Sequence, residues 1–375
     1  AATDVTGLVR AAAEEAVDLV VVGPEAPLVA GLVDALAVAG IPAFGPSADA
    51  ARLEGSKAFA KEVMRAAGVP TASWSTVADV EAGMAAIERY PVVLKYDGLA
   101  AGKGVVIAAD ETQARATLEE FLVARRFGDD RVIVEEHLCG EELSLLALCD
   151  GEHAVAMAPA QDYKRIFDGD EGPNTGGMGS YSPVPGVGPE RVAELSAQVH
   201  QPVVEYLRER GTPFAGVLYA GIMFTAEGPR VLEYNVRFGD PETQAVLPRL
   251  RSDLADVLER AARPGGLAGV QLAWSQDWAV TLVLAGAGYP AAPATGDVIS
   301  GLDEVPEGIE ITHAGTAARD GQIVTAGGRV LNVTGLGATP RAARDAAYAA
   351  AERIGFAGRQ LRGDIALRAV GSVSG

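Results

Sequence analysis

The segment from Val92 to Ile107 carries the first side chains able to do chemistry, and it reads as a strand, a glycine-rich loop and a second strand. A Walker loop has four residues between its first glycine and its Gly-Lys pair, and a helix follows it. Here only three residues separate Gly98 from Gly102, and a β-run follows. Such a hairpin can instead lay backbone N–H groups against a phosphate. An ordinary surface hairpin with solvated lysines is the alternative. The candidate nucleotide contacts are Lys95, Gly98, Gly102, Lys103 and Gly104.

A second candidate site lies between Val231 and Thr243. The alternation of side chains along a strand places Glu233, Asn235 and Arg237 on one face. Carboxylate and amide oxygens are hard ligands suited to Mg²⁺, and a guanidinium offers a planar donor fork to the charge that develops on a phosphoryl group. The pattern predicts metal binding at the first two residues and phosphoryl stabilisation by the third. The alternative is a strand with one solvated polar side.

Two further segments could complete a binding site. The β-run from Arg131 to Glu136 ends in two carboxylates, the first of which is Glu135, and Glu142 follows shortly after. Such an edge could meet an adenine with backbone groups and a ribose with a carboxylate. The glycine-rich loop 172–183 could bring its backbone close to a small substrate. Its candidate contacts are Asn174, Gly176, Gly177, Met178 and Gly179, preceded by the cations Lys164 and Arg165. In isolation, the glutamates also fit a solvated acidic turn, the glycine-rich loop a flexible linker, and the two cations a surface pair.

The sequence lacks the residue patterns that several classes of enzyme require. None of the four histidines lies in a Gly-x-Ser-x-Gly or Cys-His context, which argues against a nucleophilic triad. The sequence has no His-x-x-x-His or Cys-x-x-Cys spacing for zinc. The first βαβ-like unit contains no Gly-x-Gly-x-x-Gly. The chemistry must therefore rest on lysines, arginines, carboxylates and loops, and phosphoryl transfer is the chemistry that positioning and electrostatics can catalyse.

The elements that must position these residues form more than one unit, because 375 residues exceed the size at which one core stops growing. Thr6 to Pro46 alternates helix and strand, and its loop after Gly23 suits the carboxyl edge of a parallel sheet. Two strands make a poor sheet, so we expect further strands upstream and an incomplete N-terminal unit. A helix is expected from Leu53 to about Ala67. The composition shifts again at 264–266, before a β-rich final part.

Composition and charge limit the partners. With 49% apolar and 22% charged residues the chain can bury a core. A net charge of −19 argues against binding to nucleic acid or to an anionic membrane. We find no apolar run of membrane-spanning length and no signal-peptide pattern. Two cysteines without metal-ligand spacing indicate no disulfide framework. We expect a soluble, cytoplasmic monomer.

Five motifs, taken together and in order, resemble the glycinamide ribonucleotide synthetase family, the phosphoribosylamine-glycine ligases of the ATP-grasp superfamily. The resemblance covers essentially the whole chain, including Gly-Gly-Arg-Val-Leu at 327–331. The motifs are Gly-Pro-Glu-Ala-Pro-Leu (23–28), Leu-Glu-Gly-Ser-Lys (53–57), Asp-Gly-Leu-Ala-Ala-Gly-Lys-Gly-Val (97–105), Gly-Pro-Asn-Thr-Gly-Gly-Met-Gly (172–179) and Arg-Phe-Gly-Asp-Pro-Glu-Thr-Gln (237–244).

The resemblance implies a fold and a reaction. The expected fold is α/β and α+β multidomain: an incomplete Rossmann-like N-terminal unit (1–52), a two-lobed ATP-grasp domain (53–263, small lobe about 70–137) and a small β-rich C-terminal domain (264–375). The implied reaction of purine biosynthesis converts ATP, glycine and 5-phosphoribosylamine into glycinamide ribonucleotide, ADP and phosphate, assisted by Mg²⁺ or Mn²⁺. It proceeds through glycyl phosphate and needs no covalent enzyme intermediate, in agreement with the missing nucleophile.

The resemblance also implies roles for the candidate residues. Lys57 and Lys95 would contact ATP phosphates, the loop from Gly98 to Gly104 with Lys103 would close over them, and Glu135 and Glu142 would hold adenine and ribose. Glu233 and Asn235 would bind the metal, and Arg237 would steady the transferring phosphoryl group. Asp240, with the loop from Gly176 to Gly179, would border glycine and take part in catalysis. Pro24 and Glu25 would face the phosphoribosyl part, and Lys164, Arg165 and Asn174 are further substrate contacts.

Two departures from the family pattern leave alternatives open. The family's opening glycine-rich strand, loop and helix is absent from the sequence, and Tyr219 to Phe224 lacks the second acidic metal ligand that many ATP-grasp enzymes place before Glu233. Another ATP-grasp carboxylate-amine ligase is the nearest rival, and the loop 172–179 discriminates against it. A nucleotide-binding chain without turnover is the rival from another class.

Overall fold

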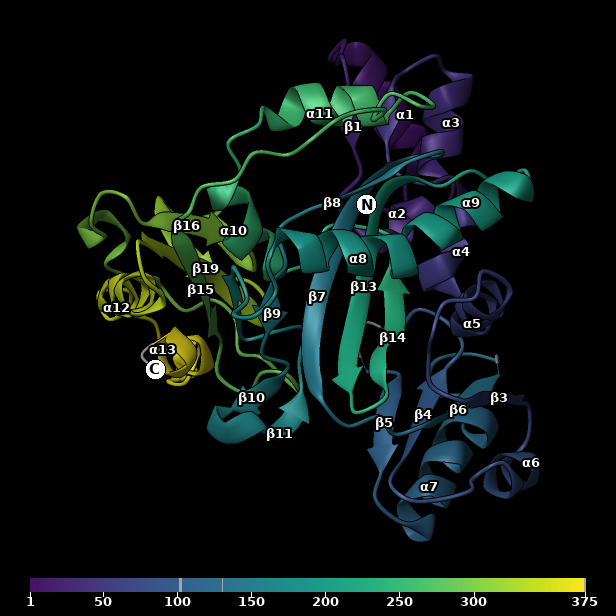
Figure 1. The fold of residues 1–375 in the computed structure, drawn as a ribbon. Helices are drawn as coiled ribbons and strands as arrows, with labels where there is room; N and C mark the ends of the chain where they lie inside the picture. Colours follow the sequence, from purple (N-terminus) through teal and green to yellow (C-terminus); the bar gives the residue numbers. More distant parts are fainter. Residues whose placement is uncertain (101–102, 130, 374–375) are drawn as a thin grey trace. The chain divides into compact units, whose positions relative to one another are not determined.

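The computed structural model describes residues 1–100, 103–129 and 131–373, which fold into two compact units (Figure 1). The first unit contains Ala1–Met157, Ala193–Phe238 and Asp253–Gln271, and the second contains Ala158–Val192, Gly239–Ser252 and Leu272–Gly375. The units interleave along the sequence because strands pair with partners far away in the chain. The expected succession of three domains stays a prediction. No helix in the described ranges is long and apolar enough to cross a membrane.

The N-terminal part of the first unit is mostly helical. Its two short strands, β1 (Val20–Val21) and β2 (Ala43–Phe44), pair in parallel, as expected for α/β organisation. Its helices are α1 (Val5–Glu14), α2 (Glu25–Val29), α3 (Leu32–Val38), α4 (Ala48–Gly55) and α5 (Lys57–Ala66).

The expected single helix from Leu53 to Ala67 is wrong, because the chain breaks at Ser56. This residue is extended (φ −138°, ψ 114°), and its hydroxyl accepts a hydrogen bond from the Phe59 N–H as the N-cap of α5. The same hydroxyl donates to Asp97 Oδ1 at 2.9 Å, and the Ala58 N–H donates to that oxygen as well. A carboxylate at a helix N-terminus is favoured by the unpaired N–H groups there. The break places Lys57 at the first position of α5.

A four-stranded antiparallel sheet of order β3-β6-β4-β5 follows, and it confirms the expected hairpin around the glycine-rich loop. Its strands are β3 (Trp74–Val77), β4 (Val92–Tyr96), β5 (Val105–Ala108) and β6 (Val132–Glu136). α6 (Val80–Ala85) and α7 (Glu111–Leu118) contribute to its core, where Leu94, Leu118 and Phe121 are buried. α7 continues as one turn of π-helix, Glu119–Val123.

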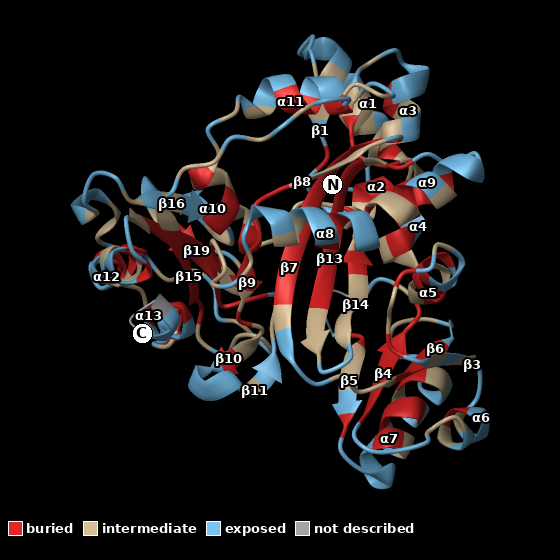
Figure 2. Cartoon of the chain, viewed as in Figure 1, coloured by how far each residue is buried: buried red, intermediate tan, exposed pale blue. Residues whose placement is uncertain are grey.

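The main sheet of the first unit has the order β14-β13-β7-β8, and its two central strands are largely buried (Figure 2). Its strands are β7 (Glu141–Asp150), β8 (Ala154–Ala156), β13 (Ala215–Thr225) and β14 (Gly228–Asn235). The buried His200, between α8 (Pro189–Val199) and α9 (Gln201–Glu209), lies with Nε2 3.2 Å from the Leu145 carbonyl. α11 (Leu254–Ala261) completes the unit.

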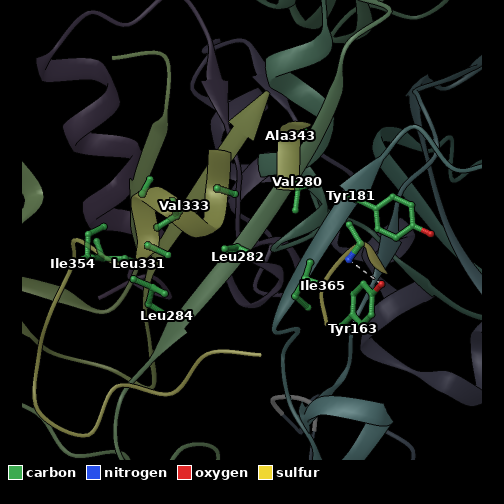
Figure 3. Close-up of a cluster of buried hydrophobic side chains, with 14 of the residues drawn as sticks. Tyr163, Tyr181, Val280, Leu282, Leu284, Leu331, Val333, Ala343, Ile354 and Ile365 are labelled. Atoms are coloured by element: carbon green, nitrogen blue, oxygen red, sulfur yellow. Dashed lines mark hydrogen bonds between the residues drawn. The ribbon is translucent and has the colours of Figure 1, made fainter. Parts of the chain in front are cut away.

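The second unit is built on a five-stranded sheet of order β16-β19-β15-β12-β9. α12 (Pro340–Ala351) packs on β15 and β19, and apolar residues from these elements form the core that Figure 3 shows. The strands of the unit are β9 (Gln161–Asp162), β10 (Arg165–Phe167), β11 (Glu171–Asn174), β12 (Gly179–Ser182), β15 (Trp278–Ala285), β16 (Glu310–His313), β17 (Thr316–Arg319), β18 (Gln322–Thr325) and β19 (Arg329–Gly337). Its other helices are α10 (Glu242–Val246), α13 (Leu367–Val373) and the 3₁₀ turns Asp168–Asp170, Leu247–Arg249 and Leu302–Glu304.

A charged network closes one side of this core. The Arg362 side chain has no exposed surface, and its guanidinium lies 3.0 Å from Asp170 Oδ1 and 2.6 Å from Asp364 Oδ2. Its Cζ lies 4.7 Å from the centre of the Tyr163 ring, and the Tyr163 hydroxyl in turn accepts from the Ala366 N–H. A buried guanidinium is stable only when its donors are satisfied. Arg362 thus ties the C-terminal segment to the loop around Asp170.

We expect Arg362→Met to destabilise the second unit by about 3–5 kcal/mol, because it leaves two carboxylates without their buried partner. Arg368→Met is the matched control: Arg368 also pairs with Asp170 but is 54% exposed, so about 1 kcal/mol or less is expected. Urea unfolding followed by circular dichroism measures both changes. Equal losses in the two variants would contradict the structural role of Arg362.

Candidate active site

Lys95 lies in β4 and is held by a buried ion-pair network. Its Nζ is 2.9 Å from Glu135 Oε2 and donates to the Leu232 carbonyl at 2.9 Å. The other oxygen of Glu135 lies 3.2 Å from Nζ of Lys61 in α5. All three side chains are almost completely buried. The expected phosphate contact Lys95 is therefore fixed by two neighbours. The Glu135 carboxylate is engaged by two lysines, and its contact with a nucleotide stays a prediction.

Lys61 belongs to this site although the sequence indicated no role for it. Burial lowers the pKa of Lys61 to about 8, against the opposing effect of Glu135. Its Nζ also donates to the Thr71 hydroxyl at 2.7 Å, and that hydroxyl donates to the Val231 carbonyl. The signal in the sequence is its spacing of four residues from Lys57, which places both lysines on one helix face.

Lys57 reaches the glycine-rich loop. Its Nζ donates to the Gly98 carbonyl at 2.9 Å. Burial lowers the pKa of Lys57, and the charge of Glu233 opposes this shift. Lys103 is exposed, and its N–H donates to the Ala100 carbonyl within the loop.

Gly104 is buried at the far end of the same loop. A Cβ there would lie 2.7 Å from Cβ of Ala100, so the close turn requires glycine. Its carbonyl accepts from the Tyr96 N–H. Gly102 lies outside the described residues.

The main sheet presents a polar face that includes the expected metal ligands. Glu233 and Asn235 of β14 lie opposite Gly221 and Tyr219 of β13. Gly221 also lies opposite Ser144 of β7, and residues opposite one another share a face. The Tyr219 and Ser144 hydroxyls are 2.9 Å apart. Neither hydroxyl was predicted, although Ser144 follows Glu142 at the two-residue spacing of a strand face.

Gly221 brings two carboxylates toward each other. A Cβ added at Gly221 would lie 3.5 Å from Glu142 Oε1 and 3.8 Å from Glu233 Cγ. Glu142 is thus close to the expected metal ligand Glu233. No group of three or more His, Cys, Asp or Glu side chains arranged for a metal occurs in the described ranges. Two carboxylates and an amide nevertheless fit Mg²⁺ or Mn²⁺, since such ions take further oxygens from phosphate and water.

An irregularity in β14 explains how Leu232 joins the lysine network. Gly221 pairs with Glu233, but the next residue, Ile222, pairs with Val231, so Leu232 has no opposite residue. Such a bulge turns a carbonyl out of the ladder, and here it accepts from Lys95. The simple alternation expected from the sequence does not contain this feature.

Arg237 lies beyond the end of β14, between two carboxylates. Its guanidinium is 3.6 Å from Glu25 Oε2 and 3.3 Å from Glu54 Oε1. Glu54 also accepts from the Val236 N–H at 2.8 Å, and burial raises the pKa of its carboxyl group against the effect of Arg237. The structure therefore brings the expected catalytic arginine to the expected phosphoribosyl contact Glu25, with the exposed Pro24 as N-cap of α2.

In the second unit, Asp240 and the glycine loop lie together. A Cβ at Gly177, where φ is +105°, would lie 2.4 Å from Cδ of Pro241. Arg329 donates to the carbonyls of the preceding residues, Gly176 and Asp240. The sequence did not single out Arg329, although it lies in the Gly-Gly-Arg-Val-Leu motif. Met178 is fully buried, and Gly179 begins β12.

The remaining candidates have local structural contacts. Arg165 pairs with Asn174 across β10 and β11, and its Nη1 donates to the Gly172 carbonyl. The Lys164 carbonyl accepts from the Thr175 N–H and hydroxyl. These contacts shape the loop before Gly176, and a direct role in substrate binding stays a prediction.

Family models of phosphoribosylglycinamide synthetase match the chain in three stretches. They are the N domain at residues 1–54, the ATP-grasp (A) domain at 55–243 and the C domain at 279–368.

Curated relatives align along almost the whole chain. A phosphoribosylamine-glycine ligase of Streptomyces coelicolor is 55% identical over 364 residues, which is 95% of this chain and 85% of the relative. One of Xylella fastidiosa is 48% identical over 374 residues, covering 98% and 87%.

Solved structures agree with this family assignment. The crystal structure of the Thermotoga maritima phosphoribosylamine-glycine ligase matches with a TM-score of 0.76 and 37% identity, covering 86% of this chain and 81% of that one. The biotin carboxylase domain of Hydrogenobacter thermophilus 2-oxoglutarate carboxylase shares the fold alone, with a TM-score of 0.74 and 20% identity. This match covers 96% of this chain and 79% of that one. The predicted family and fold class are thereby confirmed. The chain belongs to the phosphoribosylglycinamide synthetase family, with its ATP-grasp domain.

Proposed function

We propose that this chain is the ATP-dependent ligase that joins glycine to 5-phosphoribosylamine in purine biosynthesis. The glycine carboxylate attacks the γ-phosphate of ATP, which releases ADP and forms glycyl phosphate. The amine of phosphoribosylamine then attacks the glycyl carbonyl and displaces phosphate to give glycinamide ribonucleotide. The observation that carries the proposal is the convergence of buried lysines, a polar strand face and Arg237 in a chain of this family.

The ATP phosphates are received by Lys57, Lys95 and the glycine-rich loop. Lys95 is held rigidly by Glu135 and the Leu232 carbonyl, so little ordering is needed when a phosphate arrives. Lys57 already lies against the loop at Gly98, and its lowered pKa shows a poorly solvated ammonium that gains from an anion. Adenine lies along the edge that follows β6. Glu142 is the proposed ribose contact and also faces the metal strand.

Glu233 and Asn235 hold Mg²⁺ or Mn²⁺. When bound, the ion neutralises charge on the phosphate oxygens during transfer. The proximity of Glu142 Oε1 and of the Glu233 side chain to Gly221 supports this assignment. Asn235 contributes a neutral oxygen, which limits the negative charge that the site presents to ATP.

Arg237 steadies the phosphoryl group in transfer. Glu25 and Glu54 fix its guanidinium before ATP binds, so the donors are positioned in advance of the charge they meet. Lys103 approaches the phosphates when the loop closes. Asp240 and the Gly176–Gly179 segment bind glycine, with the Asp240 carboxylate receiving the ammonium group.

The direct test is ADP release by the purified protein. With ATP, Mg²⁺ and glycine, release should be slow, and it should rise strongly when freshly generated phosphoribosylamine is added, because the acceptor completes the cycle. Mass spectrometry should then detect glycinamide ribonucleotide. ATP binding without turnover would reject the ligase and support a nucleotide-binding module. Turnover with a different amine or carboxylate would support another ligase of the superfamily.

Glu233→Gln should raise the Mg²⁺ concentration needed for half-maximal turnover by at least about tenfold, because the site loses a charged oxygen ligand. Mn²⁺ binding measured by electron paramagnetic resonance should weaken in parallel. The thermal midpoint should change little, since Glu233 is only half-buried on a polar face. Glu227→Gln, an exposed carboxylate in the same hairpin, is the control. Parallel loss of folding and metal binding would argue against the role.

Arg237→Met should lower kcat by roughly 10²- to 10³-fold with a much smaller rise in the KM for ATP, because its donors act on charge that develops in the transition state. Arg230→Met, which removes a guanidinium from the strand that precedes Arg237, should leave kcat almost unchanged. Steady-state kinetics separate the two parameters. A rise in KM alone would assign Arg237 to ground-state binding.

A further inference from the structure

Arg329 stands at the start of β19 and joins two segments that are distant in the sequence. One nitrogen, Nη1, lies 2.5 Å from the Gly176 carbonyl and 2.6 Å from the Asp240 carbonyl. The same nitrogen is 3.4 Å from Oδ1 of the Asp240 side chain. All three residues belong to the second unit. A single guanidinium group therefore sets the spacing between the glycine loop and Asp240.

The glycine loop is shaped to receive this guanidinium. A Cβ at Gly176 would lie 3.0 Å from Cζ, 3.1 Å from Nη2 and 3.2 Å from Nε of Arg329, so the flat side of the group covers the place of the missing side chain. The Gly176 N–H donates to the Tyr289 hydroxyl at 3.0 Å. A Cβ at Gly328 would in turn lie 2.3 Å from the Tyr289 ring. Both backbone polar groups of Gly176 are thus held by side chains near the start of β19.

The same contacts orient the Asp240 carboxylate. Oδ1 accepts from Gln244 Nε2 at 3.0 Å and lies near Arg329. Within the described ranges no partner contacts Oδ2, and the side chain is 43% exposed. A carboxylate tied through one oxygen presents the other in a fixed direction. An ammonium group is the cation that such an oxygen would receive.

We propose that Arg329 is the positioning residue of the amino-acid site: it joins Gly176 to Asp240 and aims Oδ2 of Asp240 at the ammonium group of the substrate. This inference rests on the proposed function, in which Asp240 binds glycine. Arg329 acts through the loop and the carboxylate, which both belong to the second unit. Its loss should therefore affect the amino acid selectively.

The test compares Arg329→Met, Arg329→Lys and the control Arg341→Met, which removes an exposed arginine of α12. Arg329→Met should raise the KM for glycine by roughly 10- to 100-fold, as expected when a charged donor to several acceptors is lost. The KM for ATP should change by less than about threefold, because a group that positions only the glycine site should not change the binding of both substrates equally. Arg329→Lys should recover part of the glycine affinity, because it keeps the charge but not the planar fork.

A second variant guards against general unfolding. Gly176→Ala keeps Arg329 but places a methyl group where the guanidinium lies, so it should also raise the KM for glycine while the thermal midpoint stays near that of the control. Glycine-dependent ADP release by the unmodified protein tests the proposed function separately. If that activity is present but the Arg329 and Gly176 variants raise the KM for ATP as much as the KM for glycine, the positioning role is overturned.

Discussion

Lys61 and Lys95 are both withdrawn from water, and both depend on the single carboxylate of Glu135. Burial of an ammonium group is costly unless a counter-charge and hydrogen bonds replace water. Here one carboxylate serves two cations, and the Thr71 hydroxyl and the Leu232 carbonyl supply the remaining acceptors. Because the group keeps an excess of positive charge, it favours an anion inside a protein whose net charge is −19. The network joins α5, β4, β6 and β14.

The proposed glycine site is built differently, from main-chain groups and small residues. Around Asp240 the structure uses carbonyl oxygens, glycines without room for a Cβ and the ring of Pro241. Such a site has few side chains that could rearrange. A small amino acid offers little surface for recognition, so a rigid backbone frame is a suitable means of selecting it.

The type of chemistry could be predicted from the sequence more fully than the contacts between residues. Contiguous patterns indicated the hairpin around Gly98 and the polar face at Glu233, because these depend on neighbours along the chain. Features that depend on distant pairing were missed. The capping of α5 by Ser56 required Asp97, the bulge at Leu232 required the register of β13, and the role of Arg329 required Asp240, 89 positions away. Single-sequence periodicity carries no information about such partners.

The interleaving of the two units also has a consequence for how the chain is made. β12 pairs with β15, for example Ser180 with Thr281, so the first strand leaves the ribosome about a hundred residues before its partner. At roughly 5–20 residues per second this delay lasts about 5–20 s. During that time β12 has an unpaired edge, and only β9 is available beside it. The nascent chain therefore spends seconds with an open sheet edge, which is a template for pairing with other chains.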